Sequence, residues 1–421
     1  MKYFIKNNYL EHKETIHNFI WRSLQIFGKQ GITFFIFIIC AKLLTSNEFG
    51  VYNYILAAIF FLIIFGDFGI SAATSKYVAE YSVTDKDKLR YILFNSLIII
   101  VCLGFIITLV TVLFGSYFLK DKYIYAIYAL PLIFLAPISS LYDGVFRGLK
   151  RFKELAIISL FVGLISIVFV YFLINSFGLV GALISQNLFY FLLVTVLFFT
   201  YGKLYFKLDK GLMKTIGKYS MVIGTSSVGF YLYTRFDILV LGYFGFIEQI
   251  NSFELFAKIN LLLGTLFMIM GQVIAPEITS LISKNEYKKV LKNFIKFVSF
   301  GLLLSVLLSI IIYCSLPSIV KIYFPNLFTD EFLQIFSVLI WVFPLNMISG
   351  LISQGFTIST GNAKLGLLTI PFGGLNIIMA LIFISSFGFI GVAYSSVIVS
   401  FISKLVVWFL LYRELSRGEN G

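Results

Sequence analysis

The chain has 421 residues, of which 59% are hydrophobic and only 13% are charged. Soluble proteins carry about 25% charged residues, so this chain has too few charges to cover a water-facing surface. Its two histidines, His12 and His17, lie near the N-terminus, and its three cysteines are scattered singly. No phosphate-binding glycine loop or dinucleotide fingerprint occurs. Disordered, collagen-like and disulfide-rich classes are excluded, and we predict an integral membrane protein with neither a metal nor another cofactor.

Apolar runs of about 20 residues, the length that crosses a bilayer as a helix, occur twelve times along the chain. They begin near Ser23, Val51, Tyr91, Tyr123, Glu154, Leu179, Gly217, Glu254, Phe294, Phe332, Ala363 and Gly388. The runs are long and do not alternate, which favours helices over the strands of a barrel. The sequence therefore predicts an all-α membrane protein with twelve transmembrane helices.

The basic residues give the predicted orientation. Of the 33 Lys and Arg residues, 25 fall in the two tails and in the even-numbered connections. Basic residues stay on the cytoplasmic side, so both termini are expected to be cytoplasmic. The formal net charge of +13 is then explained by topology and by contact with anionic membrane lipids, and no nucleic-acid partner is expected.

An internal repeat divides the chain into halves. The segment from Phe177 to Ser185 (FGLVGALIS) aligns without gaps with the segment from Phe387 to Ser395 (FGFIGVAYS), 210 positions later. We predict two six-helix pseudo-repeats of the same orientation around a central cavity, an arrangement suited to alternating access. Chance similarity between aliphatic helices is the alternative. The predicted parts are a cytoplasmic tail (1–22), the first bundle (23–202), a cytoplasmic linker (203–216), the second bundle (217–412) and a cytoplasmic tail (413–421).

Several short motifs resemble a known family. They are Arg22, KLLTSNEFGVY at 42–52, FGDFGIS at 65–71, KYVAE at 76–80, GVFRGLKRF at 144–152 and RFDILVLG at 235–242. In order and spacing they resemble the polysaccharide-biosynthesis flippases, including O-antigen flippases, of the multidrug/oligosaccharidyl-lipid/polysaccharide (MOP) exporter superfamily. The resemblance covers essentially the whole chain. Residues 248–253 (EQINSF) depart from it, since the family often has a Gly-Tyr pair there.

The resemblance implies a transporter of the bacterial cytoplasmic (inner) membrane and no enzymatic activity. Its substrate would be an undecaprenyl-pyrophosphate-linked oligosaccharide, such as an O-antigen or another repeat unit of a surface polysaccharide, moved to the outer leaflet. A polysaccharide polymerase and a chain-length regulator are the partners that this role implies. The sequence leaves open the sugars, the oligomeric state and any coupling to protons or sodium ions.

Three charged residues lie at a similar depth in the cytoplasmic half of predicted spans. At 1.5 Å per residue, Lys29 is about 10 Å inward from Arg22, and Asp67 and Lys404 are about 13 Å from the nearest cytoplasmic basic residues. Charges within the bilayer are costly and therefore mark functional candidates. We expect Lys29 and Lys404 to bind pyrophosphate and Asp67 to hold one of them in an ion pair that pyrophosphate displaces. A permanent structural pair is the alternative.

Arg235 and Asp237 share the seventh predicted span. Two positions apart on a helix, their side chains point about 200° apart and cannot easily pair with each other. One should face the cavity and the other a neighbouring helix. We assign Arg235 to phosphate binding, because its planar guanidinium grips two oxygens at once, and Asp237 to coupling or to an ion pair.

Other polar residues in the spans have two interpretations. Glu254 with Lys258, and Asp143 with Arg147, are one helical turn apart and predict local pairs; the second pair is either a helix-end contact, which we favour, or a cytoplasmic gate. Side chains suited to binding sugars, but equally to helix packing, are Tyr231, Tyr233, Ser226, Ser227, Asn260, Gln272, Asn346, Gln354 and Asn376.

Three other functions compete with the flippase. A multidrug or cation antiporter of the same superfamily would share the repeat, but basic residues outnumber acidic ones in these spans, which favours an anionic substrate. A membrane-embedded polysaccharide polymerase or glycosyltransferase usually has a sizeable outer loop with catalytic residues, whereas every predicted outer connection is short. A scaffold protein would not need the repeat.

Overall fold

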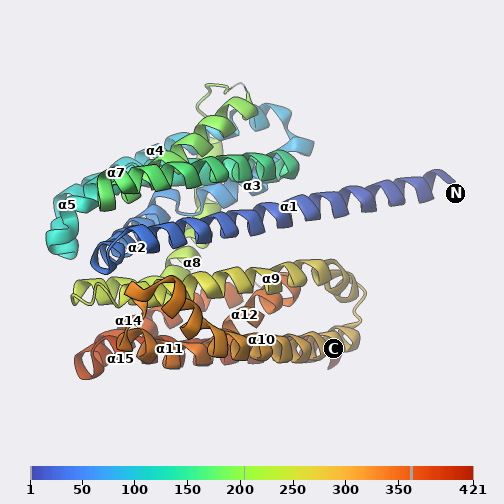
Figure 1. Ribbon diagram of the computed structural model, residues 1–421. Helices are drawn as coiled ribbons and strands as arrows, with labels where there is room; N and C mark the ends of the chain where they lie inside the picture. The colour runs from blue at the N-terminus through green and yellow to red at the C-terminus, as the bar shows by residue number, and fades with distance from the viewer. Residues whose placement is uncertain (1, 203, 361–363, 421) are drawn as a thin grey trace. The chain divides into compact units, whose positions relative to one another are not determined.

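The computed structural model describes residues 2–202, 204–360 and 364–420, and over these residues the chain is helical with short connections (Figure 1). Residue 203, where the predicted linker begins, and the terminal residues Met1 and Gly421 lie outside the described ranges. The first helices are α1 (Lys2–Leu43), α2 (Ser46–Asp67), α3 (Ile70–Thr84), α4 (Lys86–Leu119), η1 (Lys120–Lys122), α5 (Tyr123–Ala126), η2 (Ile127–Ala129), α6 (Leu132–Gly148), α7 (Phe152–Tyr201) and α8 (Lys210–Tyr243). They are followed by α9 (Ile250–Ser283), α10 (Tyr287–Tyr323), η3 (Pro325–Leu327), α11 (Asp330–Leu339), η4 (Ile340–Val342), α12 (Phe343–Ile352), the π-helix η5 (Ser353–Thr357), α13 (Lys364–Leu367), α14 (Thr369–Phe387) and α15 (Phe389–Asn420).

The chain packs into two compact units. Unit 1 comprises residues 1–44 and 58–227, and unit 2 comprises residues 45–57 and 228–421. The unit boundaries therefore fall inside α2 and α8, whereas the sequence places the division in the linker at 203–216. Close helix contacts explain the difference. A Cβ on Gly50 would lie 2.2 Å from the carbonyl oxygen of Ile247, which ties the start of α2 to unit 2. A Cβ on Gly224 would lie 2.7 Å from the carbonyl oxygen of Phe68 in unit 1.

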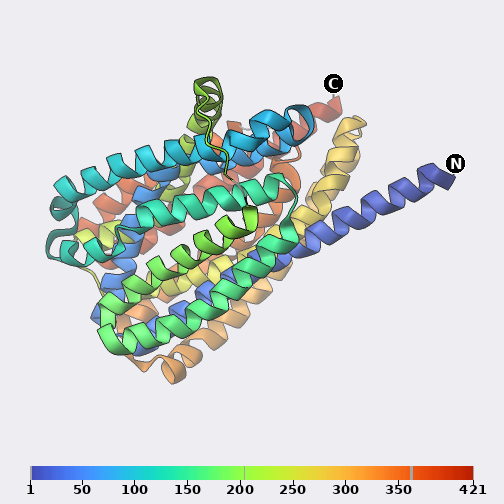
Figure 2. The same cartoon turned by 90° about the horizontal axis from the view of Figure 1, so that it is seen from above.

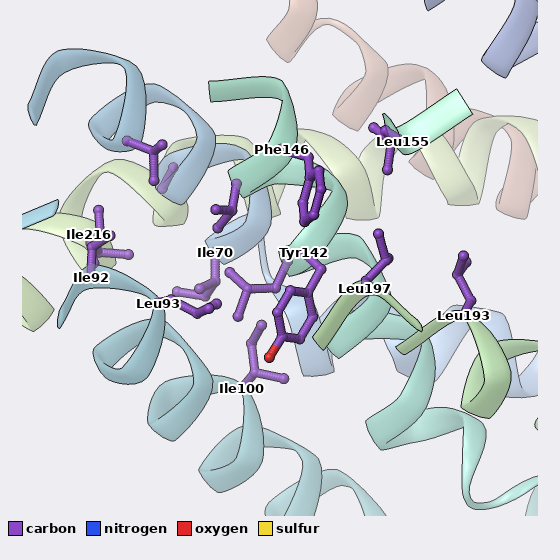
Figure 3. Close-up of a cluster of buried hydrophobic side chains, with 14 of the residues drawn as sticks. Ile70, Ile92, Leu93, Ile100, Tyr142, Phe146, Leu155, Leu193, Leu197 and Ile216 are labelled. Carbon is purple, nitrogen blue, oxygen red and sulfur yellow. The ribbon is translucent and has the colours of Figure 1, made fainter. Parts of the chain in front are cut away.

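Unit 1 has a core made by α3, α4, α6, α7 and the start of α8. Figure 3 shows this cluster, in which Tyr142 and Phe146 of α6 lie between Ile92 of α4 and Leu197 of α7. The most extensive contact between two helices of unit 1 is that between α1 and α7. Helix α1 runs unbroken from Lys2, so the predicted tail is, from residue 2, the first part of a long helix (Figure 2).

Helix α7 is a hairpin. Its 50 residues would extend about 75 Å if straight, far more than the bilayer's hydrocarbon thickness of about 30 Å. At Gly178 the backbone leaves the helical region, with φ 55° and ψ −131°, and reverses direction. The two ends of α7 meet, since a guanidinium nitrogen of Arg151 donates to the carbonyl oxygen of Thr200 at 3.3 Å. The fifth and sixth predicted spans therefore correspond to the two arms of this hairpin.

Unit 2 contains a similar hairpin formed by α14 and α15. The turn is at Gly388, with φ 63° and ψ −147°. The hydroxyl of Ser395 on α15 donates to the side-chain oxygen of Asn376 on α14 at 2.9 Å, which fixes the two arms against each other. Helix α12 packs against both α9 and α10. These contacts place residues from α8, α12, α14 and α15 close together inside unit 2.

Nine helical segments of the described chain are long and apolar enough to cross a membrane. One of them is the α7 hairpin, counted as a single segment. Helices α6 and α8 are not among the nine. Helix α6 has only 17 residues, and α8 carries Arg235 and Asp237. The protein is an all-helical, multi-pass membrane protein, while the number of twelve spans stays a prediction.

Candidate functional site

Lys404 is a buried cation of unit 2. It lies on α15 with only 8% of its surface exposed. Its ammonium group donates to the hydroxyl oxygen of Tyr233 at 3.1 Å and to the side-chain oxygen of Asn346. Among the residues that the structure describes, no ion pair involves Lys404. Its charge is therefore solvated by neutral dipoles and is not balanced by a carboxylate.

Polar contacts from four helices hold this lysine in place. The hydroxyl of Ser403 lies 2.7 Å from that of Tyr233, next to the lysine contact. The amide of Asn376 donates to the backbone carbonyl oxygens of Leu232 and Tyr233, both at 3.4 Å, which anchors α14 to this part of α8. The site thus combines α8, α12, α14 and α15. A buried positive charge with only neutral partners is an anion-binding candidate, because an anion would supply the missing compensation.

Arg235 belongs to a second charged cluster of unit 2. One of its terminal nitrogens lies 2.6 Å from a carboxylate oxygen of Glu254, a residue of α9 that is almost fully buried. The other carboxylate oxygen lies 3.9 Å from the ammonium nitrogen of Lys258. The predicted local pair of Glu254 and Lys258 is present, but the shorter contact is with Arg235, which sequence spacing did not indicate. Two cations share one carboxylate, so the three side chains carry a net positive charge.

Asp237 lies near this cluster but outside its ion pairs. Its carboxylate accepts a hydrogen bond from the backbone N–H of Ile238 at 2.9 Å. Within the described ranges no ion pair joins Asp237 to Arg235 or to another basic residue. The two neighbouring charged residues of this span therefore have different partners. The guanidinium of Arg235 contacts the carboxylate of Glu254, and the carboxylate of Asp237 accepts from the backbone N–H of Ile238.

In unit 1, no ion pair of the described residues joins Lys29 to Asp67. Lys29 is exposed on α1, and the ion pairs of the described residues do not include it. Asp67 ends α2, and its carboxylate accepts hydrogen bonds from the backbone N–H of Ser71 at 3.1 Å and from the Ser71 hydroxyl. Phe68 and Gly69 between them have positive φ values of 38° and 80°. In this conformation Asp67 therefore bridges the break between α2 and α3.

A polar cluster in unit 1 joins α1 to α6. The carboxylate of Asp143 lies 2.7 Å from the guanidinium of Arg147 and accepts a hydrogen bond from the amide of Gln25 at 2.8 Å. Arg22 in turn donates to Gln25. The predicted pair of Asp143 and Arg147 is thus present and also contacts another helix. Sequence analysis missed Gln25, although a glutamine within an apolar span was a usable signal.

Among the described residues, no three His, Cys, Asp or Glu side chains gather closely enough to hold a metal ion. The charged groups described above include a hydrogen-bonded cation, ion pairs and two hydrogen-bonded carboxylates. Such an arrangement can bind, orient and release a charged solute.

Comparisons with known proteins place this geometry in context. A family model described as "polysaccharide biosynthesis protein" matches residues 15–282. No curated protein sequence matches the chain significantly. Solved structures match over nearly the whole chain, although with low sequence identity.

Three solved structures illustrate the similarity. An inward-facing multidrug resistance MATE family transporter of the MOP superfamily has a TM-score of 0.81 and 17% identity, with 93% of this chain and 96% of that chain covered. The lipid II flippase MurJ, in an inward closed conformation, has a TM-score of 0.70 and 17% identity, with coverages of 96% and 89%. A MOP superfamily transporter from Pyrococcus furiosus, described as having a binding pocket of reverse polarity that suggests a different function, has a TM-score of 0.66 and 16% identity, with coverages of 94% and 95%. At these identities the match establishes the shared fold.

Proposed function

The chain belongs to the polysaccharide biosynthesis protein family, as the family model shows, and from this premise we propose that it is a flippase for a lipid-linked oligosaccharide. The substrate is an undecaprenyl-pyrophosphate-linked oligosaccharide, a repeat unit of an O-antigen or of another surface polysaccharide. It is carried across the bacterial cytoplasmic membrane, with both termini of the protein on the cytoplasmic side. Alternating access of the two predicted six-helix repeats is the mechanism that we propose.

Lys404 is the observation on which this proposal depends. A pyrophosphate carries negative charge that must leave water when it enters the membrane, and a pre-placed cation lowers that cost. Lys404 offers a charge that no carboxylate among the described residues neutralises. A site for cationic drugs would require the opposite polarity. We therefore assign the pyrophosphate to Lys404.

Arg235 is the second proposed phosphate contact. Its guanidinium contacts the carboxylate of Glu254 at 2.6 Å, and its planar fork can grip two phosphate oxygens at once. In our proposal the pyrophosphate competes with Glu254 for this guanidinium. Lys29, exposed on α1, is the third proposed contact, and Asp67 and Asp237 are the acidic groups proposed for coupling.

The fold alone does not separate this proposal from multidrug transport, since both kinds of transporter are among the similar structures. The polarity of the substrate-binding site is the property that distinguishes the flippase proposal from multidrug transport. The Pyrococcus furiosus transporter is described in those terms, and Lys404, which has no carboxylate partner among the described residues, supports an anionic substrate here. A polysaccharide polymerase and a chain-length regulator are proposed as partners because they would consume the translocated product.

Deletion of the gene in its host tests the proposal. We expect loss of one surface glycan and accumulation of its lipid-linked precursor on the cytoplasmic side, both restored by the wild-type protein and not by a Lys404→Gln variant present at the same level. Normal surface glycan together with greater sensitivity to cationic drugs would contradict the proposal and favour the antiporter.

A further inference from the structure

Unit 2 contains an open cavity, outside the charged clusters, whose lining combines polar and apolar side chains. It has a volume of about 710 Å³ and lies between the second half of α9 and the segment formed by η5 and the two residues after it. Its volume falls in the range of about 300–1,000 Å³ that is usual for small-molecule sites. Among the described residues that line it none is charged. The polar ones are Gln272, Thr279, Ser280, Ser283, Gln354 and Ser359, and the others are Ala275, Pro276 and Ile358.

Two irregularities in the helices shape this cavity. Pro276 lies inside α9 and has no N–H, so it cannot donate to the backbone carbonyl oxygen of Gln272 one turn earlier. On the opposite wall the backbone forms a π-helix, in which the N–H of Ile358 donates to the carbonyl oxygen of Ser353 at 3.0 Å. Such π-helical insertions are rare and occur frequently at functional sites. Both irregularities disturb the regular backbone hydrogen bonding beside the cavity.

The side chains of the lining offer both hydrogen-bond acceptors and amide donors. The hydroxyl of Thr279 donates to the carbonyl oxygen of Ala275 at 2.9 Å, and that of Ser359 donates to the carbonyl oxygen of Gly355 at 3.0 Å. Their protons are thereby used, while their oxygen lone pairs remain. The amide of Gln272 reaches the side-chain oxygen of Gln354 only at 3.5 Å, a weak hydrogen bond that a ligand would readily replace. A neutral ligand rich in hydroxyl groups matches this lining.

One helical segment carries both a contact of Lys404 and a lining residue of the cavity. Asn346, which accepts from Lys404, and Gln354, which lines the cavity, are eight residues apart on the continuous segment α12–η5. At 1.5 Å per residue this separation is about 12 Å along the helix axis. A molecule that places an anion at Lys404 could therefore extend a neutral polar part of that length into the cavity.

We propose that this cavity binds the sugars of the lipid-linked substrate while Lys404 holds its pyrophosphate. The inference rests on the proposed function and adds to it a separate sugar subsite. Gln272 and Gln354 would exchange their weak mutual hydrogen bond for bonds to sugar hydroxyls. The hydroxyl-lined wall on α9 would accept further sugar protons.

Binding of two probes tests this assignment. The full-length protein in nanodiscs is titrated with undecaprenyl pyrophosphate, which has no sugar, and with lipid-linked oligosaccharide extracted from the host strain. We expect Gln354→Leu and Gln272→Leu each to weaken binding of the sugar-bearing probe by about 10-fold, since one or two hydrogen bonds are lost. Binding of the sugar-free probe should stay unchanged, which also shows that each variant is folded. Gln334→Leu, at an exposed glutamine of α11 in the same unit, is the matched control.

The outcomes separate the two proposals. If wild type binds both probes equally, or if the cavity variants weaken both probes alike or neither, the sugar subsite is overturned while the pyrophosphate site stands. If wild type binds neither probe, the proposed function fails and the subsite fails with it. Selective loss of the sugar-bearing probe in the cavity variants, but not in Gln334→Leu, establishes the subsite.

Discussion

Gly178 and Gly388 adopt nearly the same left-handed backbone conformation, at φ 55° and ψ −131° and at φ 63° and ψ −147°. They are 210 positions apart, the offset at which the sequence repeats. Three residues after each lies another glycine, Gly181 or Gly391, where a Cβ would lie within about 2 Å of the carbonyl oxygen eight residues earlier. Each unit therefore contains a helical hairpin that turns at the same place in the same way, which supports the predicted repeat.

Alanine at either turn should destabilise the protein. At a positive φ with this ψ an L side chain is strained, so we expect Gly178→Ala and Gly388→Ala each to cost about 1–3 kcal/mol. The measurement is the thermal midpoint at which detergent-solubilised protein stops eluting as a single species. Gly374→Ala is the control, because Gly374 lies in α14 with open space around it. Equal midpoints for Gly388→Ala and the control would contradict the expected strain.

Lys404→Gln should weaken anion binding without destabilising the fold. The variant loses charge-assisted hydrogen bonds worth about 1.5–3 kcal/mol, so affinity for undecaprenyl pyrophosphate should fall by about 10-fold or more. Because the lost charge was buried with no ionic partner among the described residues, the thermal midpoint should stay equal or rise. Lys292→Gln, at an exposed lysine of α10, controls for the net charge of the protein. A large drop in stability with unchanged affinity would instead make Lys404 a structural residue.

The contact between Arg235 and Glu254 predicts opposite effects for two variants. Arg235→Lys should impair transport, because an ammonium cannot grip two phosphate oxygens in the manner of a guanidinium. Glu254→Gln should strengthen pyrophosphate binding several-fold, because the competing carboxylate is gone. Both affinities can be measured by titration in nanodiscs. Full transport by Arg235→Lys would remove Arg235 from the proposed site, and weaker binding in Glu254→Gln would show that Glu254 orients the arginine and does not compete.

Asp67→Asn isolates the charge of Asp67 from its hydrogen bonds. An asparagine side-chain oxygen can still accept from the N–H of Ser71, so the break between α2 and α3 should be preserved. If Asp67 acts in coupling, transport falls while the amount of protein in the membrane stays normal. Ser71→Ala, which keeps the charge, should transport normally. Normal transport by Asp67→Asn at normal protein level would leave Asp67 a purely structural role.

Cysteine labelling can decide whether α6 crosses the membrane. In a variant whose native cysteines are replaced by serine, we expect Asp121→Cys to react with an impermeant reagent from outside and Lys153→Cys to react only after permeabilisation. The two positions lie before and after α6 and are exposed. Labelling of both from one side would reduce the number of spans and contradict the predicted orientation.

Membership of the helical and membrane classes was predictable because both follow from local composition. The hairpin turn was also indicated, since the aligned FGLVG and FGFIG segments contain the glycines that the turns require. The pairing of charges was less predictable. Glu254 was assigned to Lys258, one helical turn away, whereas its shorter contact is with Arg235 on another helix.

The sequence by itself determined that this is a helical membrane protein of the polysaccharide biosynthesis family, because length, hydropathy and the order of short motifs are properties of the chain. Only the tertiary structure decided which polar residues surround Lys404 and which line the cavity. From sequence, the same two interpretations, sugar binding or helix packing, applied to Tyr233, Asn346, Gln272 and Gln354. In the structure the first two contact Lys404 and the last two line the cavity. Helical periodicity fixes the face on which a residue lies, whereas the partner of that face depends on the packing of helices far apart in the chain.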